Sequence, residues 1–397
     1  MTMQRWQKRA AKWRHLAASG KLTRELACWW SERRFGRFAQ RFGLNHAALR
    51  HDMFAGTMRY RIEGAGPVFS GRVEALRLIE MGRFGNVFFQ LLHAAMIARR
   101  IGVTTIEVFP FRGAPPVPFI EAGGLRFVFN VTDPPTRPTF VGAFFHTFTF
   151  PGLLNGVPES HVTDIVDHVL RHIFAHLLDA GPQGAPDTIV AHLRGGDVFE
   201  PGSAPINYVQ PPASYYHLAC LQARESFGVR HVVLVSEDRR NPAIVLLEQS
   251  LVRSGFTVRF QSASFEADAS LVVNAAHIVA SFGTFCEALG MLSTRVHSYT
   301  AFRHFESHRL YRRDMKRHSE TLLVLQAHGV KAVRIVDTDN TYVGPESWDM
   351  SDATLQLLCE YPQSGLHIDY PQDARDDHLA AVFESCFDRP ESADALS

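Results

Sequence analysis

The sequence predicts an α/β fold with two Rossmann-like domains, and three observations lead to this prediction. The chain has 397 residues, which is long enough for two hydrophobic cores. Residues 189–299 alternate short apolar runs with amphipathic stretches, separated by Gly- or Pro-marked joints, which is typical of a parallel sheet with helices on both faces. A β-α-β unit is predicted earlier, over residues 72–109.

Residues 1–40 predict basic amphipathic helices. Four tryptophans and several apolar residues recur there at helical spacing, with Arg and Lys between them. One interpretation is a peripheral helix on an anionic membrane, and the other is a helical pair that packs against the acidic residues 331–397. We do not expect nucleic-acid binding, because the formal net charge is only +1 and no recognised nucleic-acid module accompanies the basic segment.

The β-α-β unit is expected to place a glycine-containing loop between a strand and a helix. Residues 72–79 predict the first strand, 81–86 the loop, 87–100 the helix and 104–109 the second strand, and Gly102 ends the helix. Glycines in the loop permit close backbone approach to a ligand, and the helix directs its amide-rich end to the same place. A plain turn would also account for the glycines.

Residues 109–158 lack clean periodicity and are expected to be irregular. A helix at 161–179 and a linker at 181–187 then lead into the second domain. Its strands are predicted at 189–193, 232–235, 257–260, 277–280 and 295–299, and its helices at 213–227, 243–254, 265–276 and 285–292.

Chemistry-bearing side chains follow the first strand of that second domain. The apolar run 189–193 ends in His192, Arg194 and Asp197, with two glycines among them. In open α/β sheets the carboxyl ends of the strands face the ligand, and a guanidinium is a planar, permanently charged fork that suits a diphosphate. The alternative is a salt bridge between Arg194 and Asp197 that merely stabilises a surface turn.

Two further loops are expected at the same edge of the sheet. Residues 236–238 bring Asp238 there, and residues 281–284 bring hydroxyls and backbone amides to a helix N-terminus, where phosphate oxygens bind well. The alternative is simple N-capping by Ser281 or Thr284, with Glu287 completing a capping box after Thr284.

The stretch from His192 to Asp197 resembles the His-x-Arg-Arg-Gly-Asp motif of the fucosyltransferase superfamily, particularly glycosyltransferase family 11, the α-1,2-fucosyltransferases. His192, Arg194, Gly196 and Asp197 match, whereas Gly195 stands in place of the second arginine. This departure leaves the sugar donor open.

Residues 82–90 are similar to the Gly-Gly-Leu-Gly-Asn-Gln-Met-Phe-Gln opening of the same family. Arg83 replaces the second glycine. Four positions match: Gly85, Asn86, Phe89 and Gln90. The two motifs occur in family order, and the resemblance covers residues 73–299.

The resemblance implies a GT-B type fold, in which two Rossmann-like domains face a cleft. It also implies inverting, metal-independent transfer of fucose from GDP-fucose to a hydroxyl of a glycan acceptor, possibly a lipid-linked one. Carried over residue by residue, catalytic roles fall to Arg194 and Asp197. The implied donor-binding residues are His192, Arg194, Gly85, Asn86, Asp238, Ser281, Gly283 and Thr284.

This interpretation predicts a basic helical segment at 1–65, an acceptor-side α/β domain at 66–180, a donor-nucleotide domain at 181–310 and a helical, acidic extension at 311–397. Two alternatives stay open, namely a transferase that uses another sugar nucleotide and a non-catalytic glycan- or nucleotide-binding protein. Turnover of a GDP-sugar would distinguish them.

We expect no cofactor other than the donor substrate and no metal ion. Asp337-x-Asp339 lies outside the motif-bearing domain, and His304, His308 and His318 have mostly cationic neighbours, which repel a metal ion. The five scattered cysteines and the lack of an apolar run of about 20 residues predict a cytoplasmic protein. Residues 1–40 would place it at the inner face of the plasma membrane if they bind lipid.

Overall fold

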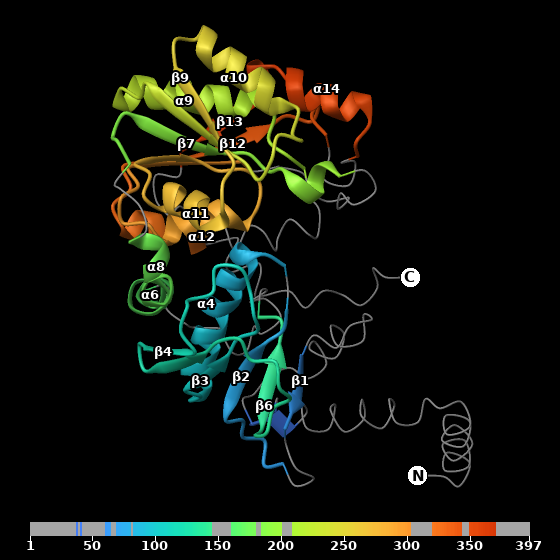
Figure 1. The fold of residues 1–397 in the computed structure, drawn as a ribbon, viewed down its shortest axis with the longest axis vertical. Coiled ribbons are helices and arrows are strands. Elements are labelled where there is room, and N and C mark those ends of the chain that lie inside the picture. Colours follow the sequence, from blue (N-terminus) through green and yellow to red (C-terminus); the bar gives the residue numbers. More distant parts are fainter. Residues whose placement is uncertain are drawn as a thin grey trace, which may run out of the picture. The chain divides into compact units, whose positions relative to one another are not determined.

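The computed structural model describes residues 37–38, 40–41, 60–64, 69–80, 82–144, 160–179, 184–200, 209–302, 320–343 and 349–370. These residues form two separate sheets, each with mostly parallel pairing, so the predicted α/β class is confirmed (Figure 1). The described residues within 1–81, 93–110 and 117–156 belong to one compact unit. Those within 82–92, 111–116 and 157–397 belong to the second.

The first unit contains a six-stranded sheet in the order β1-β6-β2-β3-β5-β4. Helix α4 (Phe84–Ile101) belongs to it from His93 onward, and His93 Nδ1 lies 2.8 Å from the carbonyl oxygen of Phe144. The strands are β1 (Tyr60–Glu63), β2 (Ala75–Leu78), β3 (Thr105–Glu107), β4 (Phe119–Ala122), β5 (Leu125–Val128) and β6 (Thr139–Gly142).

Two expectations for the first half of the chain were wrong. Residues 109–158, expected to be irregular, contain strands β4, β5 and β6. Strands β4 and β5 form a hairpin across Gly123 and Gly124, whose φ angles of 56° and 76° suit the mirror-image turns that match strand twist. In addition, α4 begins at Phe84 rather than after the expected loop, so the motif residues at 85 and 86 lie in its first turn.

The second unit contains a seven-stranded sheet in the order β13-β12-β11-β10-β7-β8-β9, in which only the β12–β13 pair is antiparallel. The predicted alternation of strands and helices is confirmed. The segment set apart as a helical, acidic extension, 311–397, contributes strands β12 and β13 and helix α14 to this unit. The strands are β7 (Thr188–His192), β8 (His231–Val235), β9 (Thr257–Gln261), β10 (His277–Val279), β11 (Ser298–Phe302), β12 (Ala332–Thr338) and β13 (Leu366–Asp369).

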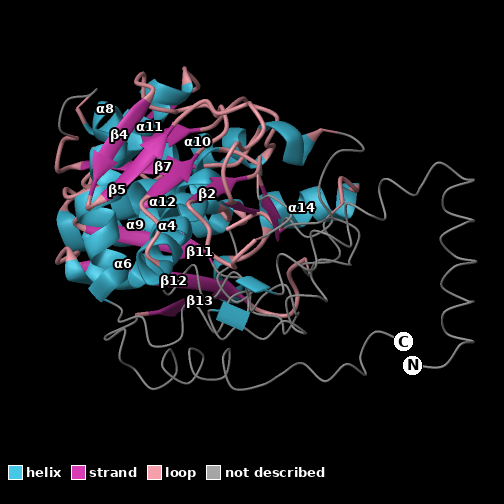
Figure 2. Cartoon of the chain, turned by 90° about the horizontal axis from the view of Figure 1, so that it is seen from below, coloured by secondary structure: helices cyan, strands magenta, loops and turns pink. Residues whose placement is uncertain are grey.

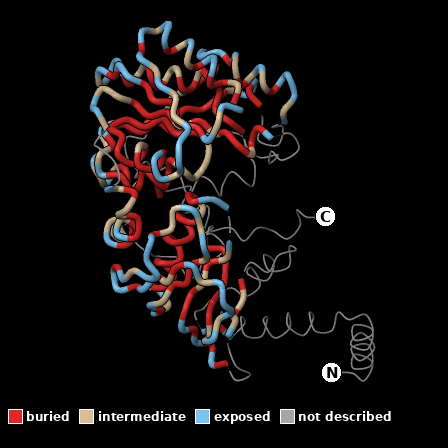
Figure 3. The backbone as a smooth tube through the Cα atoms, in the orientation of Figure 1, coloured by how far each residue is buried: buried red, intermediate tan, exposed pale blue. Residues whose placement is uncertain are grey.

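Helices cover both faces of this sheet. Figure 1 shows α9, α10 and α14 over one face and α11 and α12 over the other, and Figure 2 shows the same mixture of strands and helices from below. Most β-strand residues of the sheet are buried, as the red tube of Figure 3 shows. The helices are α9 (Ala213–Phe227), α10 (Ala243–Arg253), α11 (Phe265–Val273), α12 (Thr284–Leu292) and α14 (Asp352–Glu360).

The helix expected at 161–179 is interrupted. It consists of α6 (Ser160–Ile165), the π-helical turn η2 (Val166–Leu170), α7 (Arg171–Ile173) and α8 (Ala175–Leu178). Segment η2 packs against α12, and α8 packs against α11. Sequence periodicity indicates a helix here but does not reveal the extra residue that a π turn accommodates.

Several predictions fall on residues outside the described ranges. They include the basic helices of residues 1–36 and the histidines at 304, 308 and 318. Within the described residues, no helix combines the length and apolar character needed to cross a membrane. The domain boundaries and the cleft expected between the two domains stay predictions.

Candidate functional site

The motif residues lie where the second sheet reverses its strand order. From β7 the chain adds β8 and β9 on one side and β10, β11 and β12 on the other. Ligands of open α/β sheets bind beyond the carboxyl ends of the strands at such a switch point. The carboxyl ends of β7 and β10 carry His192 and the loop with Ser281, so these two sequence-predicted residues come together at this position.

His192 is held as a neutral side chain. Its Nδ1 lies 2.7 Å from Ser281 Oγ, and its ring lies 4.8 Å from the ring of Phe285. Burial, with a further contribution from the positive charge of Arg194, lowers the pKa of His192 to about 3. An uncharged imidazole offers hydrogen bonding without adding to the positive charge of the site.

Two guanidinium groups converge on one carboxylate. Arg194 Nη2 and Arg83 Nη2 each lie 3.2 Å from Asp197 Oδ1, and Arg83 Nη1 lies 2.6 Å from Glu237 Oε2. The salt bridge considered as an alternative for Arg194 and Asp197 is therefore present. The Arg194 side chain is mostly buried, with 17% of it exposed.

Gly195, which stands where the family motif has its second arginine, has little free space around its Cα atom. A Cβ atom at this position would lie 2.8 Å from both Asp238 Oδ1 and Ser236 Oγ, closer than real contacts permit. The loops after β7 and β8 are thus packed together at Gly195. The second guanidinium near the Asp197 carboxylate comes from Arg83 instead, a residue that stands in place of a glycine of the other family-like motif.

Asp238 ties these loops to each other. Its Oδ1 accepts hydrogen bonds from the backbone N–H groups of Gly196 and Arg240, at 3.3 and 2.9 Å, and its Oδ2 lies 3.2 Å from Arg240 Nε. Asn241 Nδ2 donates to the carbonyl oxygen of Arg194 at 3.0 Å. The structure therefore places Asp238 at the predicted site and gives it a role in loop geometry.

The loop before α12 does not form the side-chain cap that was the alternative to an anion-binding loop. The N-cap residue is Gly283, no side chain caps the helix, and the φ of 141° at Gly283 favours glycine. The alternative of capping by Ser281 or Thr284 is wrong because both hydroxyls have other contacts. That of Ser281 lies against His192, and Thr284 Oγ1 donates to Asn86 Oδ1 at 2.9 Å.

The two family-like motifs meet at this point. A Cβ atom on Gly85 would lie 2.5 Å from backbone and side-chain atoms of Thr284, so only glycine lets the first turns of α4 and α12 pack so closely. A Cβ on Gly283 would lie 3.6 Å from Arg194 Nη1. The predicted residues Gly85, Asn86, Gly283 and Thr284 therefore lie together beside Arg194.

A metal-binding cluster is absent from the described part of the chain, in which no three His, Cys, Asp or Glu residues are placed to share an ion. Asp337 is buried in β12, and Asp339 accepts hydrogen bonds from Thr341 and Tyr361. Neither aspartate lies in the loops that carry the motif residues.

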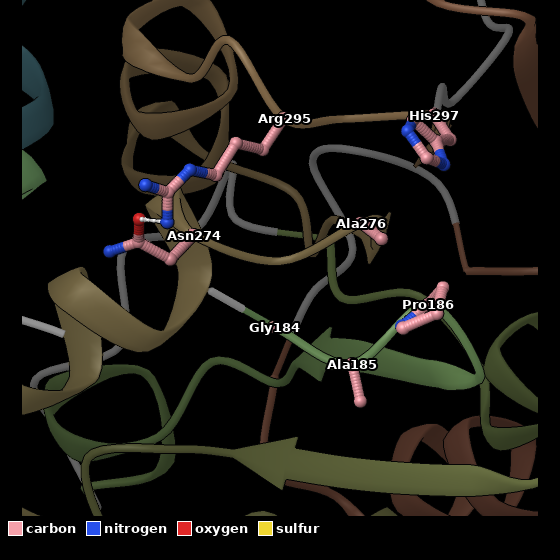
Figure 4. A pocket seen from close by; sticks show the side chains of 7 residues that line it. All are labelled: Gly184, Ala185, Pro186, Asn274, Ala276, Arg295 and His297. Atoms are coloured by element: carbon pink, nitrogen blue, oxygen red, sulfur yellow. Dashed lines mark hydrogen bonds between the residues drawn. The ribbon is translucent and has the colours of Figure 1, made fainter. Parts of the chain in front are cut away.

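A pocket of about 340 Å³ lies at the opposite edge of the second sheet, before the amino ends of β7, β10 and β11. Figure 4 shows that Arg295 extends toward Asn274, with Nη1 2.6 Å from Asn274 Oδ1, and away from His297. Because the side chains of Arg295 and His297 point in different directions, we do not assign the predicted diphosphate site to this pocket. Its lining residues are Gly184, Ala185, Pro186, Asn274, Ala276, Arg295 and His297.

Comparison with solved structures shows similarity in fold to fucosyltransferases. POFUT1 in complex with GDP-fucose matches with a TM-score of 0.34 and 13% identity, covering 57% of this chain and 97% of that chain. POFUT1 in complex with GDP gives 0.34 and 12%, covering 54% and 93%. NodZ alpha-1,6-fucosyltransferase soaked with GDP-fucose gives 0.33 and 10%, covering 75% and 99%.

The similarity concerns the fold alone. Identities and TM-scores this low do not determine which donor or acceptor the present chain uses. No protein-family model matches the sequence, and no curated protein matches it. Functional inference therefore depends on the residues of the site.

Proposed function

We propose that the chain is a glycosyltransferase that moves fucose from GDP-fucose to a hydroxyl of a glycan acceptor, with inversion and without a metal ion. The observation that supports this most is the convergence of Arg194 and Arg83 beside the N-terminus of α12, at the switch point of the second sheet. This arrangement concentrates positive charge and amide donors where a diphosphate would bind.

The proposed reaction needs charge stabilisation at the leaving group. The oxygen of the acceptor hydroxyl attacks the anomeric carbon and its proton is released to solvent, while the bond from that carbon to the β-phosphate oxygen breaks and GDP leaves with the bonding electrons. Arg194 is proposed to neutralise the charge that develops on this oxygen, together with the amides that begin α12. Asp197 orients the guanidinium of Arg194 through the 3.2 Å contact.

The remaining predicted residues fit the nucleotide. His192, Asp238 and Ser281 are proposed to contact the nucleoside, and Gly85, Asn86, Gly283 and Thr284 to surround the phosphates or sugar. A neutral His192 suits hydrogen bonding to an uncharged base. The sugar nucleotide and a glycan acceptor are thus the proposed partners.

A non-catalytic binding protein, or a transferase for another sugar nucleotide, is the alternative. One observation favours the non-catalytic binding protein. Asp197, Glu237 and Asp238 already form ion pairs with the guanidiniums of Arg83, Arg194 and Arg240. A diphosphate must compete with these carboxylates, and a site that only binds nucleosides needs no such exchange.

A nucleotide screen tests the proposal. Calorimetry with GDP-fucose, UDP-sugars and CMP-sugars should show GDP-fucose binding at least about tenfold more tightly than the others, and GDP-fucose should then be consumed in the presence of glycans. Preference for a UDP- or CMP-sugar would support the alternative donor. Tight GDP-fucose binding without consumption across acceptors would support the non-catalytic protein.

We expect turnover to persist in excess EDTA. The guanidiniums and the start of α12 supply the positive charge that Mg²⁺ supplies in other reactions with a diphosphate leaving group. The measurement is the rate of GDP release with EDTA, compared with the rate with added Mg²⁺ or Mn²⁺. Loss of turnover in EDTA that returns with metal would contradict the metal-independent mechanism.

Removal of residues 1–36, which spares the buried Phe38 that packs against Phe140, should leave GDP binding unchanged within about twofold, because every proposed donor contact begins after residue 71. GDP affinity of the truncated and full chains can be compared by calorimetry, with thermal unfolding as the control for folding. Sedimentation with anionic vesicles tests the proposed membrane contact separately. A folded truncation that no longer binds GDP would place this segment in the donor site.

A further inference from the structure

A partly buried three-residue cluster lies away from the donor contacts. Arg171 Nη1 lies 2.5 Å from Asp167 Oδ1, His328 Nε2 lies 2.9 Å from the same oxygen, and Arg171 Nη2 lies 3.1 Å from His328 Nδ1. The side chains of Arg171 and His328 are only 16% and 10% exposed. Asp167 and Arg171 come from the interrupted helix, and His328 comes from the chain before β12.

The cluster is attached to the end of α12. Arg171 Nε donates to the carbonyl oxygen of Leu292, and Nη2 donates to that of Ser293, both at 2.9 Å. Terminal carbonyls of a helix lack intrahelical partners and carry its negative partial charge. A guanidinium therefore stabilises this end of α12, whereas the other end carries Gly283 and Thr284 of the proposed donor site.

The π turn directs the cluster toward α12. Asp167 lies within η2, and the backbone N–H of Arg171 closes the turn by donating to the carbonyl oxygen of Val166. A π turn is rare and persists where tertiary contacts compensate for it. The contacts from Arg171 to Leu292 and Ser293 are such a compensation.

The chemistry of arginine fixes the protonation of His328. A guanidinium has no acceptor, so His328 Nδ1 must accept from Arg171, and Nε2 must carry the hydrogen that is donated to Asp167. A second proton on the ring would go to Nδ1, and the resulting N–H donor would then face the N–H donor of Arg171. His328 is therefore neutral in this arrangement.

The surrounding charges favour the neutral form. Burial, followed by the positive charge of Arg171, lowers the pKa of His328, and the carboxylate of Asp167 opposes this shift. Arg171 and Asp167 are the titratable groups that contact its ring from the interrupted helix, and α12 contributes only the carbonyls of Leu292 and Ser293 to the cluster.

We propose that Arg171 is a positioning residue for the donor site, and that it holds α12 in place only while His328 is uncharged. The inference rests on the proposed function, because it takes the start of α12 as the diphosphate seat. Protonation of His328 breaks its hydrogen bond with Arg171 and sets two cations against each other. Arg171 then leaves the carbonyls at the end of α12.

A change at one end of α12 reaches the other because the helix is short and tightly packed. Its nine residues span about 13 Å as a rigid rod. A Cβ atom at Gly290 would lie 3.0 Å from the Tyr299 ring and 3.8 Å from Leu325, so the helix has little room to bend. Release of the C-terminal end therefore shifts Gly283 and Thr284, and small displacements at a charge-stabilising site reduce binding strongly.

The pH dependence of GDP affinity tests this role. His328→Gln keeps an acceptor for Arg171 and a donor for Asp167 but cannot be protonated. GDP affinity of the unmodified chain should fall between about pH 6.5 and about pH 4.5 by at least about fivefold more than that of His328→Gln. The loss sets in below the ordinary histidine value, because the lowered pKa keeps His328 neutral above it.

The control is His168→Gln, which removes an exposed histidine from the same helical segment, where it lies 3.7 Å from Asp164. This variant should follow the unmodified chain at every pH, and the titration of GDP itself is common to all three proteins. Equal pH dependence for His328→Gln and the unmodified chain would overturn the proposal. So would a His168→Gln profile that is as flat as that of His328→Gln.

A measurement without nucleotide separates the two levels of inference. In Arg171→Gln, amide hydrogen exchange of residues 289–293 should be at least about tenfold faster than in the unmodified chain, with GDP affinity lower at both pH values. Unchanged exchange would overturn the anchoring of α12. A third outcome is faster exchange in Arg171→Gln together with no GDP binding by the unmodified chain. In that case α12 is anchored as described, but the proposed function is wrong, and so is the donor-site role of Arg171.

Discussion

Replacing Arg194 with lysine should lower the turnover of GDP-fucose by about a hundredfold or more, with a smaller effect on GDP affinity. Lysine keeps one positive charge but loses the planar fork that binds two oxygens at once. Negative charge grows on the bridging oxygen only as the bond breaks, so the interaction is stronger in the transition state than in the ground state. Single-turnover rates and GDP affinity, measured on the same preparation, separate the two effects.

Arg240→Lys is the matched control for Arg194→Lys. Arg240 lies 3.2 Å from Asp238 in the same group of loops, yet its side chain is 53% exposed. From the sequence alone, Arg83 is the natural control because relatives have glycine there, but its contact with Asp197 makes it part of the site. Equal turnover for Arg194→Lys and the unmodified protein would reduce Arg194 to half of a surface salt bridge.

Restoring the second arginine of the family motif should damage the site. Gly195→Arg puts a Cβ atom 2.8 Å from Asp238 Oδ1 and Ser236 Oγ, so these side chains must move, and Asp238 then loses the hydrogen bonds that tie the loops after β7 and β8 together. Overpacking of this kind costs about 1–3 kcal/mol, and we expect GDP affinity to fall at least about tenfold. The measurement is GDP binding by calorimetry, alongside the free energy of unfolding.

Gly195→Ala separates the steric effect from the added charge. It introduces the same Cβ atom without a guanidinium and should show most of the loss, because the contact is made by the Cβ itself. If Gly195→Arg binds GDP more tightly than the unmodified chain, the packing explanation for Gly195 is wrong.

Local patterns predicted the second sheet well. Helix α9 was expected at its observed bounds, because its periodicity is flanked by Pro212 and by Gly228, which adopts a φ of 72°. Strands β7, β8, β9 and β10 were placed to within one residue at each end, since short apolar runs between Gly- and Pro-marked joints are typical of a parallel sheet. These features depend on neighbours in the sequence.

What the sequence did not reveal depends on contacts between distant residues. Strand β6 is buried at all four positions, so it shows no alternation, and it is too short to be recognised otherwise. Arg83 meets Glu237 across 154 positions in the sequence, and no local pattern indicates that pairing. The alternative of a side-chain cap on α12 is wrong because Ser281 and Thr284 find partners on β7 and α4 instead.

The shared carboxylate of Asp197 has a consequence for ligand choice. Because Arg194 and Arg83 already have an anionic partner, an entering anion exchanges one ion pair for another and gains only the difference. A ligand with a single phosphate group carries less negative charge than a diphosphate, so it gains less from replacing Asp197 and Glu237 at the two guanidiniums. If the site binds a nucleotide as proposed, we therefore expect a diphosphate, with its greater charge and span, to compete with these carboxylates better than a monophosphate does.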